Sequence, residues 1–347
     1  MRPSCSAASG PAESDNPEQR DSVRFWARRL SFYAIAAWAA ITANFALPRL
    51  MPGGPLNAVL NRFEGQLSPE AVDALSAEFG ISPHQSLWEQ YLTYLGNLVH
   101  GNLGTSFTYF PTPVSTVMGQ SLPWTVCLLS VATLLAWLVG TALGVTAGWR
   151  RGTKFDVILP AGAFLRAIPH FWVGLLLVTV FAVTLGWLPA SGGYSPDLTP
   201  GLDPAFLSSA ISHAILPAAA IVIGSLAAHM LNMRNLMVTT LAEDYVVVAE
   251  AKGLRPRRVM YNYAARNAML PAIASFALEL GLVVSGSLLV EKVFSFPGIG
   301  FVLFQAIHNQ DYPLLQGILL VTTFAVLVAN LGADLAFFVL DPRTREA

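Results

Sequence analysis

Six ionisable side chains interrupt the long apolar stretches of this 347-residue sequence: Arg166, His170, His229, Arg234, Glu279 and Asp334. A charge at the centre of a membrane-embedded helix costs about 2.5–3.5 kcal/mol on insertion scales, so such residues usually face a bundle interior or a water-filled pathway. We select Arg166, His229 and Glu279 as candidate pathway-lining residues. The alternative is pairing within the bundle or snorkelling to an interface, which we favour for Arg234 and Asp334 because they lie near the ends of their stretches.

The sequence lacks the motifs of the common catalytic and nucleotide-binding sites. It has no His-Glu-x-x-His, no Gly-x-Ser-x-Gly and no spaced Cys/His cluster, which argues against an intramembrane enzyme and against a metal site. It also has no Gly-x-x-x-x-Gly-Lys-Ser/Thr phosphate loop. Its two cysteines, Cys5 and Cys127, are far apart. We therefore expect no cofactor bound by this chain.

The composition identifies the solvent in which these residues must lie. The chain is 54% hydrophobic and 12% charged, whereas a soluble domain is about 25% charged. A span needs about 20 mostly apolar residues, and six stretches meet or approach that length: residues 30–47, 121–149, 157–187, 214–233, 267–290 and 313–340. The sequence therefore predicts an all-α, six-span integral membrane bundle. The first stretch could be mistaken for a signal peptide, but no convincing cleavage pattern follows it.

Lys and Arg are distributed unevenly between alternate connections. Of the 20 Lys and Arg residues, 15 lie in residues 1–29, 149–156, 239–266 and the C-terminal tail, and three lie in the other connections. The positive-inside rule then places both termini in the cytoplasm, with lipid around the bundle. The net charge of −1 gives no reason to expect nucleic acid as a partner.

The resulting division of the chain has five parts. Residues 1–23 are polar and are predicted to be a disordered cytoplasmic tail. Residues 24–47 form the first span, residues 48–120 form an extracytoplasmic loop, residues 121–341 form a five-span core, and residues 342–347 are a cytoplasmic tail. In the loop we expect one helix starting at Ser68 and a second carrying Trp88 and Tyr91. The loop either packs on the spans as a lid or contacts a delivery protein.

A short cytoplasmic helix is predicted at residues 243–254. Acidic residues open it, Lys252 closes it, Gly253 suits a left-handed C-terminal cap, and Pro256 prevents simple continuation. Its apolar residues, including Val246 and Val248, either fill a groove of another protein or pack on their own bundle.

The pattern around this helix resembles the cytoplasmic "EAA" loop of the inner-membrane components of binding-protein-dependent ABC importers. The matching elements are Asp244-Tyr245, Ala-Glu-Ala-Lys-Gly-Leu at 249–254 and Arg-Asn-Ala-Met-Leu-Pro at 266–271. Further elements at 52–55, 101–106, 168–171, 188–192, 213–217, 291–300, 311–317 and 341–343 extend the resemblance from about residue 25 onward, and are similar to the B-type permease of the dipeptide/oligopeptide/nickel branch. Val246, Val247 and Val248 depart from the basic, small-residue stretch that is common there, and Glu250 replaces a frequent Arg.

The resemblance implies a type I ABC importer transmembrane fold in the plasma (inner) membrane of a prokaryote, with alternating access and no catalysis by this chain. It implies ATP and Mg²⁺ on partner ABC ATPase subunits, a second homologous permease subunit and an extracytoplasmic substrate-binding protein. The ATPase-coupling residues are then Glu243, Asp244, Tyr245, Val248, Ala249, Glu250, Ala251, Lys252 and Gly253. Peptides are the expected solute, and nickel or another small solute is the alternative. A secondary transporter coupled to ions through Glu279 and Asp334 would leave the structured cytoplasmic helix unexplained.

Overall fold

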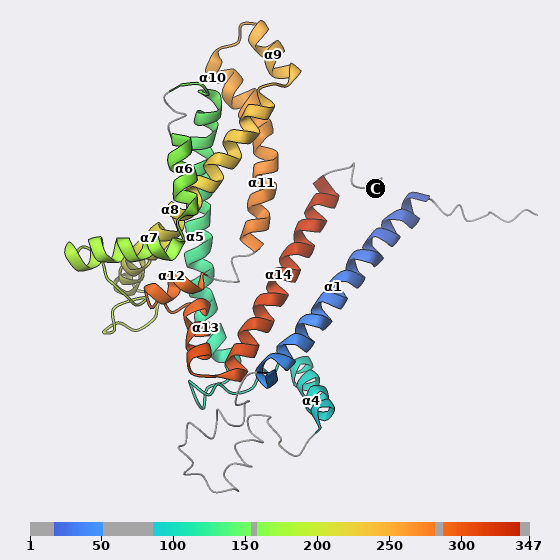
Figure 1. The fold of residues 1–347 in the computed structure, drawn as a ribbon, viewed down its shortest axis with the longest axis vertical. Helices are drawn as coiled ribbons and strands as arrows, with labels where there is room; N and C mark the ends of the chain where they lie inside the picture. The colour runs from blue at the N-terminus through green and yellow to red at the C-terminus, as the bar shows by residue number, and fades with distance from the viewer. Residues whose placement is uncertain (1–16, 51–85, 154–157, 282–286, 341–347) are drawn as a thin grey trace, which may run out of the picture.

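A computed structural model describes residues 17–50, 86–153, 158–281 and 287–340 of the chain. Within these residues the elements are helical, and one isolated backbone bridge joins Thr105 and Pro113. The predicted helix at Ser68 and the tail at 342–347 lie outside the described residues. Figure 1 shows long helices running at an angle to one another between the two ends of the molecule, with some shorter helices at each end and others between them.

Two long helices form the centre of the bundle. α5 (Val114–Trp149) and α8 (Pro204–Thr240) pack along their length, and both are longer than the predicted apolar stretches. Gly140, Gly144 and Gly148 make this close approach possible, because a methyl group on Gly144 would lie 2.5 Å from the carbonyl oxygen of Met230. Small residues four apart on one helix face are a common way of bringing two spans together.

The third predicted stretch is a broken element. α6 (Ile158–Ala167) and α7 (His170–Leu177), which continues into the π-helical segment η2 (Val178–Thr184), meet at an angle of 91°. Pro169 has no N–H to donate and disfavours the helical conformation at the residue before it, so the chain turns at this point. The predicted span over residues 157–187 is therefore a helix pair with a break, and its single crossing of the membrane stays a prediction.

The fifth predicted stretch, residues 267–290, is not one continuous helix. α11 (Arg266–Gly281) is followed by α12 (Leu288–Val293), and Ser287 between them has a non-helical backbone (φ −113°, ψ 78°). Val290 therefore belongs to a separate short helix and lies in a core cluster with Phe294 and Leu216. α13 (Ile299–His308) and α14 (Tyr312–Leu340) complete the described part of the chain.

The N-terminal helix lies beside the C-terminal one. α1 (Pro17–Leu50) begins within the segment predicted to be disordered, while residues 1–16 lie outside the described part. α1 contacts α14 through Asn44, whose amide donates to the Gln316 carbonyl at 2.8 Å, and Gln316 donates back to the Asn44 carbonyl at 2.9 Å. The predicted helix at Trp88 is α4 (Leu87–Val99), which starts with a capping box between Ser86 and Glu89.

Four described helices are long and apolar enough to cross a membrane, and a fifth span results if the bent α6–α7 pair crosses once. The six-span prediction is therefore not confirmed, because the described part of α11 is too short to meet that criterion. Figure 1 shows the start of α1, the end of α14 and α9 toward one end of the molecule, with α4, α12 and α13 toward the other. This grouping agrees with the sides assigned from the Lys and Arg distribution.

Candidate functional site

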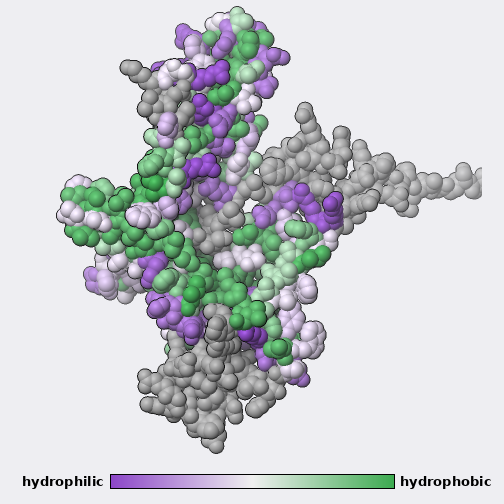
Figure 2. Space-filling model, viewed as in Figure 1, coloured by the Kyte–Doolittle hydropathy of each residue, from purple (hydrophilic) through white to green (hydrophobic). Residues whose placement is uncertain are grey.

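The predicted coupling helix projects from one end of the bundle. α9 (Asp244–Ala251) follows α8, and after a turn the chain continues through α10 (Pro256–Arg258) and the π-helical segment η3 (Val259–Ala265) into α11. In Figure 2 hydrophilic and hydrophobic colours are mixed at the end formed by α9 and α10, whereas the hydrophobic colour covers α7 and much of the middle of the molecule.

The end of α9 has the geometry that the sequence predicts. Gly253 has φ +71°, which is the left-handed conformation that glycine adopts without strain. The Leu254 N–H donates to the Ala249 carbonyl and the Gly253 N–H to the Glu250 carbonyl, at 3.4 and 2.8 Å, which is the Schellman pattern of hydrogen bonds. A defined cap of this kind fixes the direction in which the chain leaves the helix.

The apolar residues of α9 divide between two faces. Val246 and Ala249 are buried and pack with Val259 of η3 and with Trp149 of α5. Val247 and Val248 are 54% and 50% exposed. The interpretation that the cluster packs on its own bundle is therefore confirmed for one face, and docking of a partner on the other face stays a prediction. Of the nine predicted coupling residues, only Ala249 is buried, and the rest are exposed.

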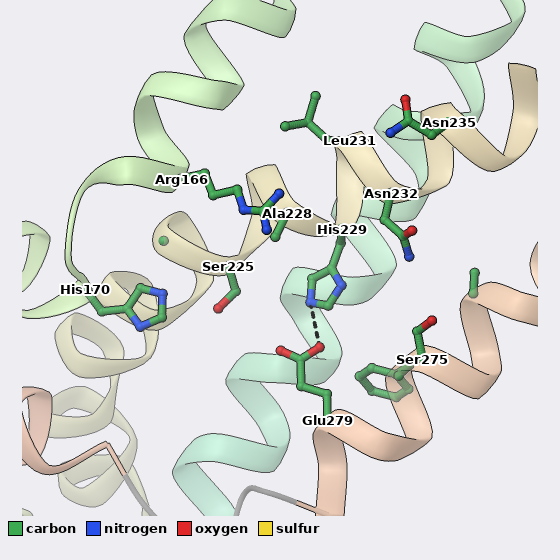
Figure 3. A pocket seen from close by; sticks show the side chains of 13 residues that line it. Arg166, His170, Ser225, Ala228, His229, Leu231, Asn232, Asn235, Ser275 and Glu279 are labelled. Atoms are coloured by element: carbon green, nitrogen blue, oxygen red, sulfur yellow. Dashed lines mark ion pairs between the residues drawn. The ribbon is translucent and has the colours of Figure 1, made fainter.

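The three candidate pathway residues share one cleft. This cleft has a volume of about 520 Å³ and lies between α6–α7, α8 and α11. Arg166 comes from the last turn of α6, His229 from α8 and Glu279 from α11 (Figure 3). Among its other lining residues are the polar side chains His170, Ser225, Asn232, Asn235 and Ser275. Sequence reasoning found His229 but not the other polar residues of α8, although Ser225, His229 and Asn232 have the i, i+4, i+7 spacing of one helix face.

His229 and Glu279 face each other across the cleft. His229 Nε2 lies 3.5 Å from a carboxylate oxygen of Glu279, and the His229 side chain is 10% exposed while that of Glu279 is 41% exposed. The distance exceeds the usual hydrogen-bond range, and Nε2 has no hydrogen-bond partner in the described part of the chain. Glu279 therefore keeps most of its hydrogen-bonding capacity for something in the cleft.

Two other ionisable residues of the first list, Asp334 and His170, contact neighbouring helices. Asp334 pairs with Arg29 and accepts a hydrogen bond from Tyr33 at 2.7 Å, which joins α14 to α1. Pairing within the bundle, the interpretation favoured for Asp334, is confirmed. The imidazole of His170 lies against Gly224 of α8, where even a methyl group would collide with the ring.

Two buried acids at the opposite end of the molecule were not identified as ionisable sites from the sequence. Glu291 is fully buried and accepts hydrogen bonds from Thr125 Oγ1 at 2.8 Å and from the Gly300 and Phe301 N–H groups at 2.6 and 3.2 Å. It thereby satisfies N–H groups in the first turn of α13. Burial raises the pKa of the Glu291 carboxyl, although these hydrogen bonds oppose the shift.

Asp311 has the same function at the start of α14. It is fully buried and accepts from the Thr108 N–H at 2.7 Å, the Leu314 N–H at 3.2 Å and the Ser106 hydroxyl at 2.5 Å. The carboxylate thus ties the segment before α5 to α14. In the sequence, the only sign of this role is that each acid lies one to eight residues ahead of an apolar helix. Acids in such positions are too common for this sign to identify a cap without the fold.

A family model described as "Binding-protein-dependent transport system inner membrane component" matches residues 140–346. The chain belongs to this family. The match covers α8–α11, with the projecting α9 inside it. The chain is therefore a permease subunit of an ATP-driven ABC importer, and ATP hydrolysis takes place on separate subunits of such a system. It is a multi-pass protein of the inner membrane.

Relatives of known name match along nearly the whole chain. A di/tripeptide transport system permease protein, DppB, of Pseudomonas aeruginosa is 37% identical over 93% of this chain and 99% of its own length. The dipeptide permease DppB of Escherichia coli K12 is 36% identical over the same shares. The oligopeptide permease AppB of Bacillus subtilis is 33% identical over 86% of this chain and 92% of its own.

The fold is also that of a solved importer. The inward-facing MetNI methionine ABC transporter contains a chain that matches with a TM-score of 0.51 and 13% sequence identity. The match covers 65% of this chain and 96% of the other. This likeness concerns the fold, and it agrees with the predicted type I importer architecture.

Proposed function

We propose that this permease carries short peptides into the cytoplasm and that α9 is the element through which ATPase subunits move it. The relatives at 33–37% identity are named as dipeptide, di/tripeptide and oligopeptide permeases, which supports peptides as the solute. ATP and Mg²⁺ are bound by the partner ATPases, a second permease subunit completes the pathway, and an extracytoplasmic binding protein delivers the solute. Both termini and α9 face the cytoplasm, as the Lys and Arg distribution predicts.

The two-faced α9 is the observation that carries this proposal. Its buried face, with Val246 and Ala249, packs on η3 and on the end of α5. A displacement of α9 is therefore transmitted to the bundle through packed side chains. Its exposed face offers Tyr245, Val247 and Val248 to a partner. ATP-driven closure of the ATPase pair would then shift the bundle between two discrete packings.

Co-purification of the ATPase subunits with this chain tests the proposal. Val248→Asp places a charge on the exposed face of α9 and should reduce co-purified ATPase at least fivefold, because a buried unpaired charge opposes docking. Leu202→Asp is the matched control, since Leu202 is 91% exposed and precedes α8 at its other end. Equal ATPase recovery with both variants, at equal permease levels, would contradict the role assigned to α9.

A further inference from the structure

The cleft between α6–α7, α8 and α11 has the chemical features of a binding site. Ser225, His229, Asn232 and Asn235 line it from α8, and Ser275 and Glu279 line it from α11. On each helix these residues recur at intervals of three or four, so they form polar stripes on spans that are otherwise apolar. Side chains of this kind are expensive in hydrocarbon, and their convergence on one cleft indicates contact with a polar molecule.

The charges in the cleft are of opposite sign and come from different elements. Figure 3 shows the Arg166 guanidinium of α6 and the Glu279 carboxylate of α11 directed into the same space, with Ser225 and His229 of α8 between them. A site with one cation and one anion favours a solute that carries both charges over one that carries a single charge. Its volume of about 520 Å³ falls within the range of small-molecule sites, roughly 300–1,000 Å³.

We propose that this cleft is a transit site for short zwitterionic peptides, with the α-ammonium group on Glu279 and the α-carboxylate directed to Arg166. The proposal rests on the peptide function proposed above and adds the residues that read the two termini. The ammonium donates hydrogen bonds to the Glu279 carboxylate, and the guanidinium can donate two parallel bonds to the carboxylate of the solute. His229 Nε2 lies 3.5 Å from the Glu279 carboxylate, beyond the usual hydrogen-bond range, so this contact leaves the carboxylate free to accept from the ammonium.

Two features of the site suit transit better than retention. Glu279 remains 41% exposed, so water screens its charge and limits the affinity. The polar stripe on α8 also continues past His229 to Asn232 and Asn235, in the direction of α9. A peptide released from Glu279 thus finds further hydrogen-bonding groups along the same helix.

The test measures peptide binding to the assembled permease–ATPase complex in lipid nanodiscs, without the binding protein, by saturation-transfer NMR. The probes are Ala-Ala, N-acetyl-Ala-Ala and Ala-Ala amide, which remove one terminal charge at a time. Wild type should bind Ala-Ala at least fivefold more tightly than either analogue. In Glu279→Gln the preference over N-acetyl-Ala-Ala should disappear, whereas in Arg166→Gln the preference over the amide should disappear. Asp197→Asn, at an exposed acid on the loop before α8, should behave as wild type.

Each variant is matched with the analogue that lacks the terminal charge it should recognise. Structural damage would instead weaken binding of all three probes alike, so the two effects can be told apart. Equal affinity of wild type for the three probes, no detectable binding of Ala-Ala, or unchanged preferences in both variants would overturn the transit site. If the complete system still imports Ala-Ala in proteoliposomes in that case, the peptide function stands and only the site is lost. Failure of wild type to import any short peptide would overturn both.

Discussion

Glu279 and Glu291 lie twelve positions apart in the sequence, in α11 and α12, yet they have opposite surroundings. Glu291 is fully buried and its carboxylate accepts three hydrogen bonds from Thr125, Gly300 and Phe301. Glu279 is 41% exposed in a cleft and faces only His229, at 3.5 Å, among the contacts described for it. A buried acid whose oxygens are occupied holds the fold together, and a partly exposed acid with free capacity is available to a solute.

The largest expected difference between the two acids concerns stability. Glu291→Ala leaves two backbone N–H groups and the Thr125 hydroxyl without this acceptor and should lower the free energy of unfolding by about 3 kcal/mol. Glu279→Ala should change it by less than about 0.5 kcal/mol, because the side chain is partly exposed and makes one long contact. Thermal unfolding of the purified protein in detergent measures both. A similar loss of unfolding free energy in the two variants would contradict the distinction between a structural Glu291 and an available Glu279.

Asp311 and Asp334 extend the same comparison to a second pair of acids. Asp311→Asn replaces one of the two acceptor oxygens with an N–H₂ group, so at least one of the donors Ser106, Thr108 and Leu314 loses its acceptor, and we expect a loss of about 2 kcal/mol. Asp334 is 28% exposed, and Asp334→Asn keeps an acceptor for Tyr33, so we expect a loss below about 1 kcal/mol. Protease resistance of the two variants over a temperature series ranks them. A greater loss for Asp334→Asn would contradict the comparison.

The smallest expected effect is a pH dependence due to Glu291. Burial raises the pKa of its carboxyl, so the folded chain holds this proton at a pH at which the unfolded chain has released it. The stabilisation is complete below the ordinary Glu pKa, near 4.3, and is lost as pH rises through the higher folded pKa. Relative to Glu291→Gln, which keeps an acceptor oxygen but does not titrate, the wild-type melting temperature should fall by a few degrees as pH rises from about 4.5. A rise would show that the hydrogen bonds outweigh burial.

The sequence predicts the parts of this molecule that depend on local chemistry. The start and end of α9 follow from Glu243, Lys252, Gly253 and Pro256, and the helix appears where these residues place it. The apolar run over 313–340 likewise becomes a single helix, α14. In both cases the signal lies within one element, so no knowledge of the fold was needed.

The parts that were wrong or incomplete depend on neighbours in space. Pro169 indicates in the sequence that the helix is interrupted. The size of the bend, 91°, depends on the packing of α7 on α8 and α12, which the sequence does not show. The extension of α5 outward to Val114 follows from its burial against Leu314 and Ile318, which lie about 200 positions later. A pathway-lining role could be proposed from the sequence for Arg166, His229 and Glu279 separately. Their meeting in one cleft depends on how three elements pack together, which the sequence does not show.

Access to the cleft at different stages of ATP hydrolysis tests the central claim most directly. Ser275 is exposed and lines the cleft, so Ser275→Cys in a chain with Cys5 and Cys127 replaced by serine provides a single reactive thiol. In the assembled complex, a membrane-impermeant maleimide applied from the cytoplasmic side should label this thiol at least tenfold more slowly when ATP and vanadate trap the ATPases closed. Labelling at the same rate with and without the trap would show that the cleft does not alternate with the ATPase cycle.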